Sequence, residues 1–508
     1  MSSINLKNLK NKNIHIVGIG GAEGSAIAEF LISHGISSIT GHDFSSKADF
    51  KKAFYNTHLG LKLEKREEVL NHLLNLPIKI NFKDHYLEDV EKADLIFVSQ
   101  VWFKYPQNLP ILEKLKNNGV QFKTITNLYF ELAPCKIISV TGTNGKTTTA
   151  RLINSIFEVW TETKVRSLKS NVYFAGNDRQ NVQVLDKLGK MKKNDVLILE
   201  TSSTQLLLNS EISPQIGVIT NITPNHIDDH GSFENYIEAK KNLIRYQGKG
   251  DFAVLNWDDE QSRKFIKFIK SKVLLFSRKE ELEKGCFVRG NNIILRENSK
   301  NCGIKQKILK QVQNDNNIVC NINDIKIPGK HNLENVLAAV SVAYLYGIDS
   351  EIIKKGILEY TGIKHRLKLL YNIDGIKYYD DTQATTPEAT IAGIESFGGD
   401  IILLAGGDDK GMSYKKLAEK INDRVKLLVL FSSDASDEIE KLIDKNKVDF
   451  VRVKNFKQAI KTLKKYYKKT DFTKDGTVLI SPATAHFYSK YIENSNKSLK
   501  EWIKSIKQ

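Results

Sequence analysis

The chain has 508 residues, 41% of them hydrophobic, which excludes both a single core and a disordered protein. Its length is that of about three domains of ~150 residues each. The formal net charge of +17 would suit a nucleic acid, a membrane surface or a phosphorylated substrate. The charges are spread as solvated faces, and no helicase-like motif accompanies them, so a nucleic-acid ATPase is suggested by charge alone.

Cysteine spacing and hydropathy predict the cellular compartment of the protein. The four cysteines, at positions 135, 286, 302 and 320, show no C-x-x-C spacing, which argues against a metal clip and fits a reducing cytoplasm. The N-terminus has no long apolar stretch before its first strand, and no run approaches 18 apolar residues. We therefore expect a cytoplasmic protein without a signal peptide, a membrane partner or a nucleic-acid partner.

The first 134 residues alternate strands with helical stretches. "NIHIVGIGGAEGSAIAEFLISHG" begins as a short apolar strand, continues as a Gly-rich turn and ends with helical periodicity. "SSITGHDF" is typical of a second strand ending at Asp43, and "ADLIFVSQ" of a further strand. The alternation predicts a Rossmann-like α/β domain over residues 1–134.

Two further α/β domains are expected. "KIISVTG" follows Ala133-Pro134 and begins a new strand–loop–helix unit, continued by "DVLILE", "IGVITNI" and "DFAVLN". This predicts a central domain of the P-loop ATPase type over 135–328, in which the polar stretch 279–325 is interpreted as a peripheral insertion. A helix in "NLENVLAAVSVAYLYG" and the strands "DIILLAGG", "VKLLVLF" and "GTVLISPA" predict a Rossmann-like domain over 329–508.

The stretch "VTGTNGKTTT" is the most specific local signal. It lacks the first glycine of the common phosphate loop G-x-x-x-x-G-K-[ST], because Val140 stands there. It nevertheless joins a buried-type strand to a helix, where backbone N–H groups face an anion and a lysine adds charge. The alternative is a Gly-Thr turn with an exposed lysine. The residues predicted to bind ATP here are Gly142, Thr143, Asn144, Gly145, Lys146, Thr147 and Thr148, with a threonine hydroxyl for Mg²⁺.

The earlier Gly-rich turn, residues 18–24, is a weaker signal. It follows a strand and opens a helix, so it could seat a diphosphate, with Asp43 placed about 20 residues on for a ribose contact. Gly18, Gly20, Gly21 and Asp43 are the candidate ligand residues. Glu23 beside an anion is unfavourable, and helix–strand packing is the alternative explanation of the glycines.

Three polar residues follow strands of the predicted central domain. Glu200 ends the strand "LILE", His226 lies in the loop "TPNHIDDH", and Lys240 lies on the following helix. A carboxylate and an imidazole near a phosphate loop suit Mg²⁺ or the groups around it. Taken singly, His226 could cap a helix and Lys240 could be a solvated charge.

Taken together, "VTGTNGKTT", "ETSSTQL", "NITPNHIDDHGSFENYIEAK", "GKHNLENVLAA", "GIKHRLK", "DDTQATTPEAT…LLAGGDDKG" and "LISPATAHF" resemble the Mur ligase family in order and spacing. The branch most similar to the chain adds D-glutamate to UDP-N-acetylmuramoyl-L-alanine in peptidoglycan synthesis. The resemblance implies three domains, ATP and Mg²⁺ as cofactors, and a monomer. It also implies two partners, a UDP-N-acetylmuramoyl-peptide precursor bound by the first domain and a free amino acid bound by the third.

The resemblance also implies roles for single residues. Lys146 would contact phosphate, and His226 would lie in the catalytic site. Thr147, Glu200 and a carbamylated Lys240 would hold Mg²⁺. The further residues matched to ATP contacts are Asn177, Asn332, Arg366 and Asp381. Those matched to the incoming amino acid are Thr385, Lys410 and His486.

Departures from the family pattern leave the acceptor open. A lysine of the family's N-D-S-K-A-T-N block is Gln383 here, a serine that holds the D-glutamate side chain is His486, and the usual Asp-His pair is Asn225-His226. The alternatives are the L-alanine-adding branch, which "GIGG" and "GHD" also resemble, and a non-catalytic nucleotide-binding partner subunit. The block "DDTQATTPEAT" favours D-glutamate, and the retained Lys146, Glu200 and Lys240 favour an enzyme.

Overall fold

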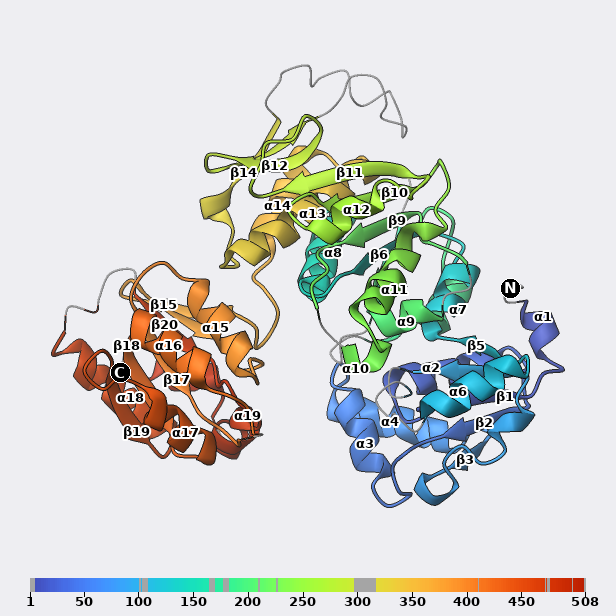
Figure 1. The fold of residues 1–508 in the computed structure, drawn as a ribbon, viewed down its shortest axis with the longest axis horizontal. Coiled ribbons are helices and arrows are strands. Elements are labelled where there is room, and N and C mark those ends of the chain that lie inside the picture. Colours follow the sequence, from blue (N-terminus) through green and yellow to red (C-terminus); the bar gives the residue numbers. More distant parts are fainter. Residues whose placement is uncertain are drawn as a thin grey trace. The chain divides into compact units, whose positions relative to one another are not determined.

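The computed structural model has an α/β fold with three sheets, which confirms the predicted fold class (Figure 1). It describes residues 5–99, 102, 108–163, 170–176, 182–208, 211–224, 227–296, 317–409, 411–470, 472, 476–495 and 497–506. The chain forms two compact units: the first unit is Met1–Asn321 with Glu334–Ile357, and the second unit is Ile322–Leu333 with Leu358–Gln508. The predicted domain boundaries after residues 134 and 328 stay predictions.

The first sheet has five parallel strands in the order β3-β2-β1-β4-β5. The strands are β1 (Ile14–Val17), β2 (Ile39–His42), β3 (Lys79–Asn81), β4 (Leu95–Val98) and β5 (Gln121–Lys123). The helices are α1 (Leu6–Leu9), α2 (Ala22–Ser33), α3 (Phe50–Thr57), α4 (Leu63–Leu74), α6 (Asn108–Asn117) and α7 (Ile125–Leu132). The chain reverses its direction across the sheet between β1 and β4, the place where open α/β sheets bind ligands.

The second sheet has nine strands in the order β14-β13-β12-β11-β10-β9-β6-β8-β7. The parallel part holds β6 (Lys136–Thr141), β7 (Val172–Gly176), β8 (Val196–Glu200), β9 (Ile216–Ile219), β10 (Phe252–Asn256) and β11 (Lys272–Ser277). The described part of the stretch interpreted as an insertion supplies β12 (Gly285–Arg289), β13 (Asn292–Arg296) and β14 (Asn317–Asn321). These extend one edge, with β13 antiparallel to both neighbours.

One hydrophobic core joins the first two sheets. The helices beside the second sheet are α8 (Lys146–Glu162), α9 (Ser203–Leu207), α10 (Ile227–His230), α11 (Phe233–Arg245), α12 (Glu260–Phe265), α13 (Lys330–Tyr346) and α14 (Ser350–Glu359). The core runs from β1 and α2 through α7 to β8 and, of these helices, to α9, α11 and α12. Because the core is shared, side chains from the first sheet reach the loops of the second.

The third sheet has six strands in the order β15-β16-β20-β17-β18-β19. They are β15 (Lys368–Ile373), β16 (Ile376–Asp380), β17 (Ile401–Ala405), β18 (Val425–Phe431), β19 (Asp449–Val453) and β20 (Thr477–Ile480), with β15 antiparallel to β16. Its helices are α15 (Pro387–Glu395), α16 (Lys415–Arg424), α17 (Asp434–Leu442), α18 (Phe456–Tyr467), α19 (Phe487–Tyr491) and α20 (Leu499–Lys504). Across the described part of the chain, no helix is both long and apolar enough to cross a bilayer.

Candidate nucleotide-binding site

The loop between β6 and α8 begins at Gly142. Val140 is fully buried within β6, which explains why the first glycine of the longer motif is not needed. Gly142 and Gly145 have φ angles of 153° and 84°, values that L side chains rarely adopt. A Cβ atom at Gly142 would collide with Thr220, and one at Gly145 with Asn335. The loop therefore depends on both glycines.

The segment that follows β9 holds this loop in place. The backbone N–H of Thr143 donates to the carbonyl of Asn221 at 2.8 Å, and that of Asn144 donates to Asn221 Oδ1 at 2.9 Å. The Thr220 hydroxyl donates to the Asn144 carbonyl at 2.6 Å. Because β6, β8 and β9 are parallel neighbours, the residues that follow them meet at one edge of the sheet.

Two lysine side chains share one carbonyl oxygen of the loop. Lys146 Nζ and Lys240 Nζ donate to the Gly142 carbonyl at 3.0 Å and 2.8 Å, and Lys146 also donates to the Thr143 carbonyl at 2.9 Å. Lys240 is only 1% exposed. Burial, and then the charge of Lys146, hold the pKa of Lys240 well below the ordinary value for a lysine. The surroundings of the loop therefore favour the uncharged form of Lys240 beside the charged Lys146.

A hydroxyl–carboxylate pair lies beside the cations. The Thr147 hydroxyl, in the first turn of α8, donates to Glu200 Oε1 at the end of β8 at 3.0 Å. Both side chains are buried. Hard oxygen ligands next to a phosphate loop fit Mg²⁺, which usually takes one or two protein oxygens together with substrate phosphates. Within the described ranges no cluster of three or more His, Cys, Asp or Glu side chains could hold a metal ion by itself.

Three predicted site residues lie outside the described residues: Asn177, His226 and Lys410. A residue missed by the sequence analysis lies against the loop instead. Asn335, on α13, approaches Gly145 closely, and its Oδ1 accepts from the Thr149 hydroxyl at 3.2 Å. The signal was present in "HNLEN", where a second asparagine follows Asn332 one helical turn later.

The N-terminal Gly-rich turn is held by Asp43, the acidic residue that follows β2. Asp43 Oδ2 accepts the backbone N–H of Gly20 at 3.0 Å, and Asp43 Oδ1 accepts the N–H and the hydroxyl of Ser45 at 2.9 Å and 2.7 Å. Gly18 has a φ of 83°, and a Cβ atom at Gly24 would collide with the Gly18 carbonyl. The structure therefore shows Asp43 positioning the turn, and its predicted ribose contact stays a prediction, as does the diphosphate role of Gly21.

Glu23, which the sequence analysis counted against an anion site, is buried between two sheets. Its Oε1 accepts from Gln205 Nε2 of α9 at 2.6 Å, and its Oε2 has no hydrogen-bond partner. Burial raises the pKa of Glu23 to about 7. Gln205 belongs to "ETSSTQL", the segment that begins with Glu200. The carboxyl group therefore links helix α2 to helix α9, a contact between residues 182 apart.

The other residues matched to ATP contacts lie in the second unit. Asp381 accepts the Ser481 hydroxyl at 2.7 Å and the Leu367 N–H at 3.1 Å, and burial raises the pKa of Asp381 to about 7. Arg366 is exposed, and its charge adds to burial in lowering the pKa of His331. Asn332 Nδ2 donates to the Pro328 carbonyl at 2.5 Å. Arg366, Asp381 and Asn332 belong to one unit, and the phosphate loop belongs to the other.

The predicted amino-acid site has a charged cluster at its edge. His486 Nδ1 lies 3.0 Å from Asp408 Oδ2, and Lys490 Nζ donates to Asp408 Oδ1 at 2.9 Å. Asp408 lies in the loop after β17, and His486 precedes α19. Thr385 is exposed in the loop before α15. His486 thus already has a carboxylate partner, which sequence spacing could not show because the two are 78 residues apart.

A phosphate loop between a buried parallel strand and a helix, with two lysines and a Thr–Glu pair at the same sheet edge, defines a P-loop nucleotide-binding protein. Comparison with protein families is more specific. The model of the Mur ligase middle domain matches residues 140–343, and that of the Mur ligase glutamate ligase domain matches residues 365–484.

Relatives that match the chain over most of its length belong to the same family. The chain is 32% identical to UDP-N-acetylmuramoylalanine–D-glutamate ligase of Acetivibrio thermocellus, over 98% of both chains. It is 35% identical to the enzyme of the same name from Clostridioides difficile, over 83% of this chain and 87% of the relative. The chain therefore belongs to the Mur ligase family, whose members are ATP-dependent ligases.

Solved structures show the same fold. UDP-N-acetylmuramate–alanine ligase from Thermotoga maritima superposes with a TM-score of 0.54 at 18% identity, over 95% of this chain and 99% of that one. The MurF ligase of the same organism, solved in complex with ADP, superposes with a TM-score of 0.52 at 16% identity, over 99% and 97%. These likenesses support the three-domain α/β architecture.

Proposed function

We propose that the protein joins D-glutamate to UDP-N-acetylmuramoyl-L-alanine, with cleavage of ATP to ADP and phosphate. The observation that carries the proposal is the pairing of Lys146 and Lys240 on the Gly142 carbonyl, beside the Thr147–Glu200 contact. The substrates are supported by relatives of that name, which are 30% to 35% identical over most of the chain.

The chemistry explains why ATP is needed. A carboxylate is a poor electrophile, so its oxygen first attacks the γ-phosphorus of ATP and ADP leaves, which forms an acyl phosphate. The amine nitrogen of the incoming amino acid then attacks the acyl carbon. The tetrahedral intermediate collapses with loss of phosphate, and the nitrogen gives up a proton. Catalysis is then mostly positioning and neutralisation of charge on the transferring group.

The described residues divide this work. Lys146 stabilises the negative charge on the transferring phosphoryl group, and the backbone N–H groups at the start of α8 hold the phosphates that precede it. Thr147 and Glu200 would hold Mg²⁺ through their oxygens. When bound, Mg²⁺ supplies positive charge beside the phosphates. Asn177 and His226 keep their proposed ATP and catalytic roles.

Lys240 is proposed to carry a carbamate in the active protein. Its buried, pKa-lowered amine is present as the neutral nucleophile more often than an ordinary lysine. The nitrogen would attack CO₂, form an N–C bond and lose a proton. The resulting anion replaces an ammonium that Mg²⁺ would repel with oxygens that it binds.

The second unit is proposed to supply the remaining ATP contacts, Asn332, Arg366 and Asp381, and to bind the amino acid near Thr385, Lys410 and His486. Asp408 would influence binding of the amino acid, because His486 and Lys490 both contact it. An acceptor carboxylate would compete with Asp408 for the ammonium of Lys490 and the imidazole of His486. We place D-glutamate ahead of a neutral amino acid because an ammonium beside a second hydrogen-bonding group suits a side-chain carboxylate.

The test is phosphate release by the purified protein with ATP, Mg²⁺, UDP-N-acetylmuramoyl-L-alanine and each amino acid in turn. We expect turnover with D-glutamate. Turnover with UDP-N-acetylmuramate and L-alanine alone would assign the chain to the L-alanine-adding branch. No turnover with any acceptor, by a protein that still binds ATP, would support the non-catalytic alternative.

A further inference from the structure

More than half of the net charge of the chain lies on two helices that touch. Residues 454–470 and 497–506 contain ten lysines and one glutamate, a net +9 of the total +17. The first range spans α18 and the second spans α20. Phe456 of α18 and Trp502 of α20 stack with ring centroids 6.2 Å apart, so the two ranges form one surface. We call it the α18–α20 face; its lysines are Lys454, Lys457, Lys461, Lys464, Lys465, Lys468, Lys469, Lys497, Lys500 and Lys504.

The lysines of α18 form a continuous exposed stripe. Its apolar residues Phe456, Ala459, Ile460 and Leu463 are buried against the third sheet. Lys457, Lys461, Lys465 and Lys468 recur at helical spacing on the opposite side and are all exposed. Like charges at such spacing repel and destabilise a helix by a few tenths of a kcal/mol a pair. A bound anionic surface would relieve this repulsion.

None of the ten lysines makes an ion pair with another described residue. The one glutamate of the face, Glu501, accepts from Ser498 at the start of its own helix, at 2.6 Å and 2.7 Å. Lys500 also adds to burial in lowering the pKa of Lys368. Among the described residues, the lysines of the face therefore have no carboxylate partner, and Lys497 lies over the Trp502 ring instead.

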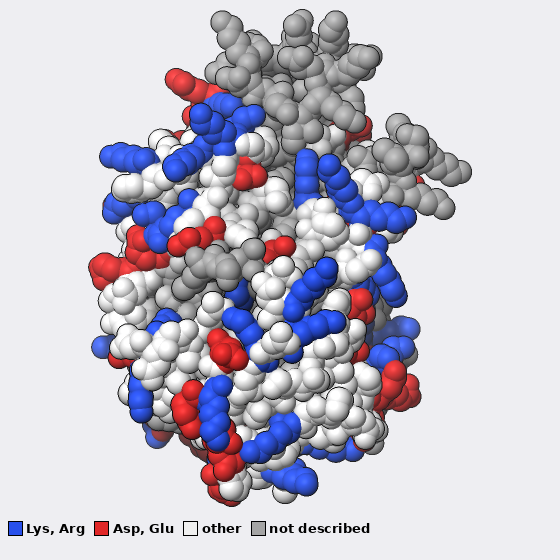
Figure 2. Space-filling view, turned by 90° about the vertical axis from the view of Figure 1, so that its right-hand side faces the viewer, with Lys and Arg blue, Asp and Glu red and all other residues white. Residues whose placement is uncertain are grey.

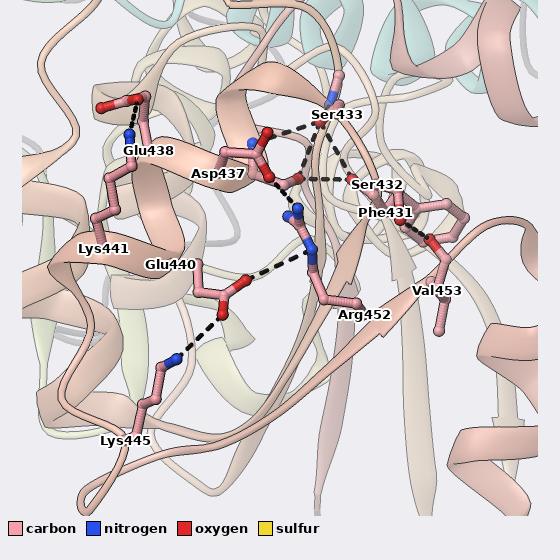
Figure 3. Close-up of polar contacts among 12 residues, drawn as sticks. Phe431, Ser432, Ser433, Asp437, Glu438, Glu440, Lys441, Lys445, Arg452 and Val453 are labelled. Atoms are coloured by element: carbon pink, nitrogen blue, oxygen red, sulfur yellow. Dashed lines mark hydrogen bonds and ion pairs between the residues drawn. The ribbon is translucent and has the colours of Figure 1, made fainter.

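In helix α17, which precedes α18 in the chain, and just after it, lysines are paired with glutamates. On the side of α17, Lys441 pairs with Glu438 at 2.7 Å and Lys445 pairs with Glu440 at 3.1 Å (Figure 3). Arg452 of β19 contacts Asp437 and Glu440. On the face of the molecule drawn in Figure 2, lysines and arginines also lie among aspartates and glutamates. The uncompensated charge of the α18–α20 face is thus a local feature and not a consequence of composition alone.

We propose that the α18–α20 face docks the protein on an anionic phospholipid surface. All ten cations are lysines, which act as point charges, whereas nucleic-acid recognition favours the planar fork of arginine. The half-buried aromatic rings of the face pack against other rings of the protein. Tyr467 stacks on Phe472 and shares a hydrogen bond with Tyr378, while Trp502 stacks on Phe456. A cluster of lysines on an amphipathic helix is a known basis for attraction to anionic lipids.

The contact would be peripheral. The expectation of no membrane partner rested on the lack of a spanning segment, and a polybasic helix face needs none. The attraction acts over a Debye length and is weakened by salt. The proposal is independent of the acceptor amino acid and of the ligase chemistry, since no residue of the α18–α20 face is assigned to either.

The test is co-sedimentation of the full chain with vesicles. We expect binding to phosphatidylcholine vesicles that contain about a third phosphatidylglycerol, no binding to pure phosphatidylcholine, and loss of binding when salt is raised from about 0.05 M to about 0.5 M. The variant K457E/K461E/K465E/K468E should bind the anionic vesicles at least about 100-fold more weakly. The four lysine-to-glutamine changes should weaken binding less.

The matched control carries the same change of net charge elsewhere. K193E/K249E/K267E/K270E replaces four exposed lysines of the first unit and should bind like the unmodified chain. Phosphate release in the absence of vesicles should be unchanged in every variant, which shows that they fold. Equal loss in the control, binding to neutral vesicles, or salt-sensitive binding to duplex DNA without vesicle binding would each overturn the proposal.

Discussion

The phosphate loop and the N-terminal Gly-rich turn are built alike and charged differently. Each joins a buried parallel strand to a helix through a loop with glycine at positive φ, Gly18 in the N-terminal turn and Gly142 and Gly145 in the phosphate loop. Around the phosphate loop lie two lysines and no acidic residue in the first turn of the helix. Around the N-terminal turn lie buried groups whose pKa is shifted by burial toward the neutral form, Glu23 and the pair His15 and His42. The motif fixes geometry, and the residues packed against it set the potential.

Among the residues of the phosphate loop, replacement of Lys146 should have the largest effect on turnover. Lys146→Ala should lower ATP-dependent phosphate release by ~10³-fold or more, because the transferring phosphoryl group loses its closest cation. Lys136→Ala, at the exposed start of the same strand, is the matched control and should leave turnover within about twofold. Near-normal turnover of Lys146→Ala would remove the phosphate loop from the mechanism.

Lys240 tests whether the second cation of the loop is a cation in the active protein. Lys240→Ala should lower turnover by about 10²-fold, and added short carboxylic acids should restore part of it by supplying the missing oxygens. Lys241→Ala alters a partly exposed neighbour paired with Glu238 and should be unaffected. Full activity of Lys240→Arg, which cannot form a carbamate, would contradict the proposed modification.

At the N-terminal turn, the buried Glu23 should make the stability of the fold depend on pH. Its pKa of about 7 in the folded chain lies above the ordinary 4.5, so the stability it contributes is complete below pH 4.5 and is lost as the pH rises through 7. The loss is on the order of 3 kcal/mol, and Glu23→Gln should remove it. Hydrogen exchange of the α2 and β1 amides at pH 5 and pH 8 measures the change.

The control for that experiment is Glu29→Gln, an exposed residue on the same helix. Its variant should keep the pH dependence of the unmodified chain. An unchanged dependence in Glu23→Gln would mean that the carboxyl group is ionised in the folded protein.

The buried histidine pair gives a smaller effect of opposite sign. His15 Nδ1 and His42 Nε2 are 2.8 Å apart, and burial lowers the pKa of both, that of His42 to about 3. Because an unfolded histidine takes up a proton near pH 6.5 and His42 does not, local stability should fall by about 2 kcal/mol from pH 6.5 to pH 5. Exchange of the β1 amides should report it. His42→Asn should flatten this acid branch, whereas His72→Asn, exposed on α4, should not.

The sequence predicted the parts of the fold that local periodicity controls. Strands β1, β2, β4, β6, β8, β9, β10, β17, β18 and β20 all fall within stretches expected to be strands. Strands β12 and β13 were not predicted, because short apolar runs such as Cys286–Val288 lie in a lysine- and asparagine-rich stretch. Composition outweighed pattern in that interpretation.

The site was predictable where its residues are close in sequence or share a motif. Gly142 to Thr147 and the end of β8 follow from strand–loop–helix context, because parallel strands bring their carboxyl ends together. The Glu23–Gln205 and His486–Asp408 contacts did not follow, since each joins residues far apart in the chain whose partners only packing determines. The same holds for the burial that lowers the pKa of Lys240.

The carbonyl of Gly142 has a consequence for how fast and how tightly a nucleotide is captured. By holding the long side chain of Lys146 in advance, it takes the loss of rotational freedom of that lysine, on the order of 2 kcal/mol, out of the binding step and into folding. An arriving phosphate meets an ammonium group that is already positioned at the loop. It replaces a neutral oxygen by a charged one without first ordering the chain. Until a nucleotide binds, the Gly142 carbonyl oxygen thus accepts the hydrogen bond that a phosphate oxygen would take.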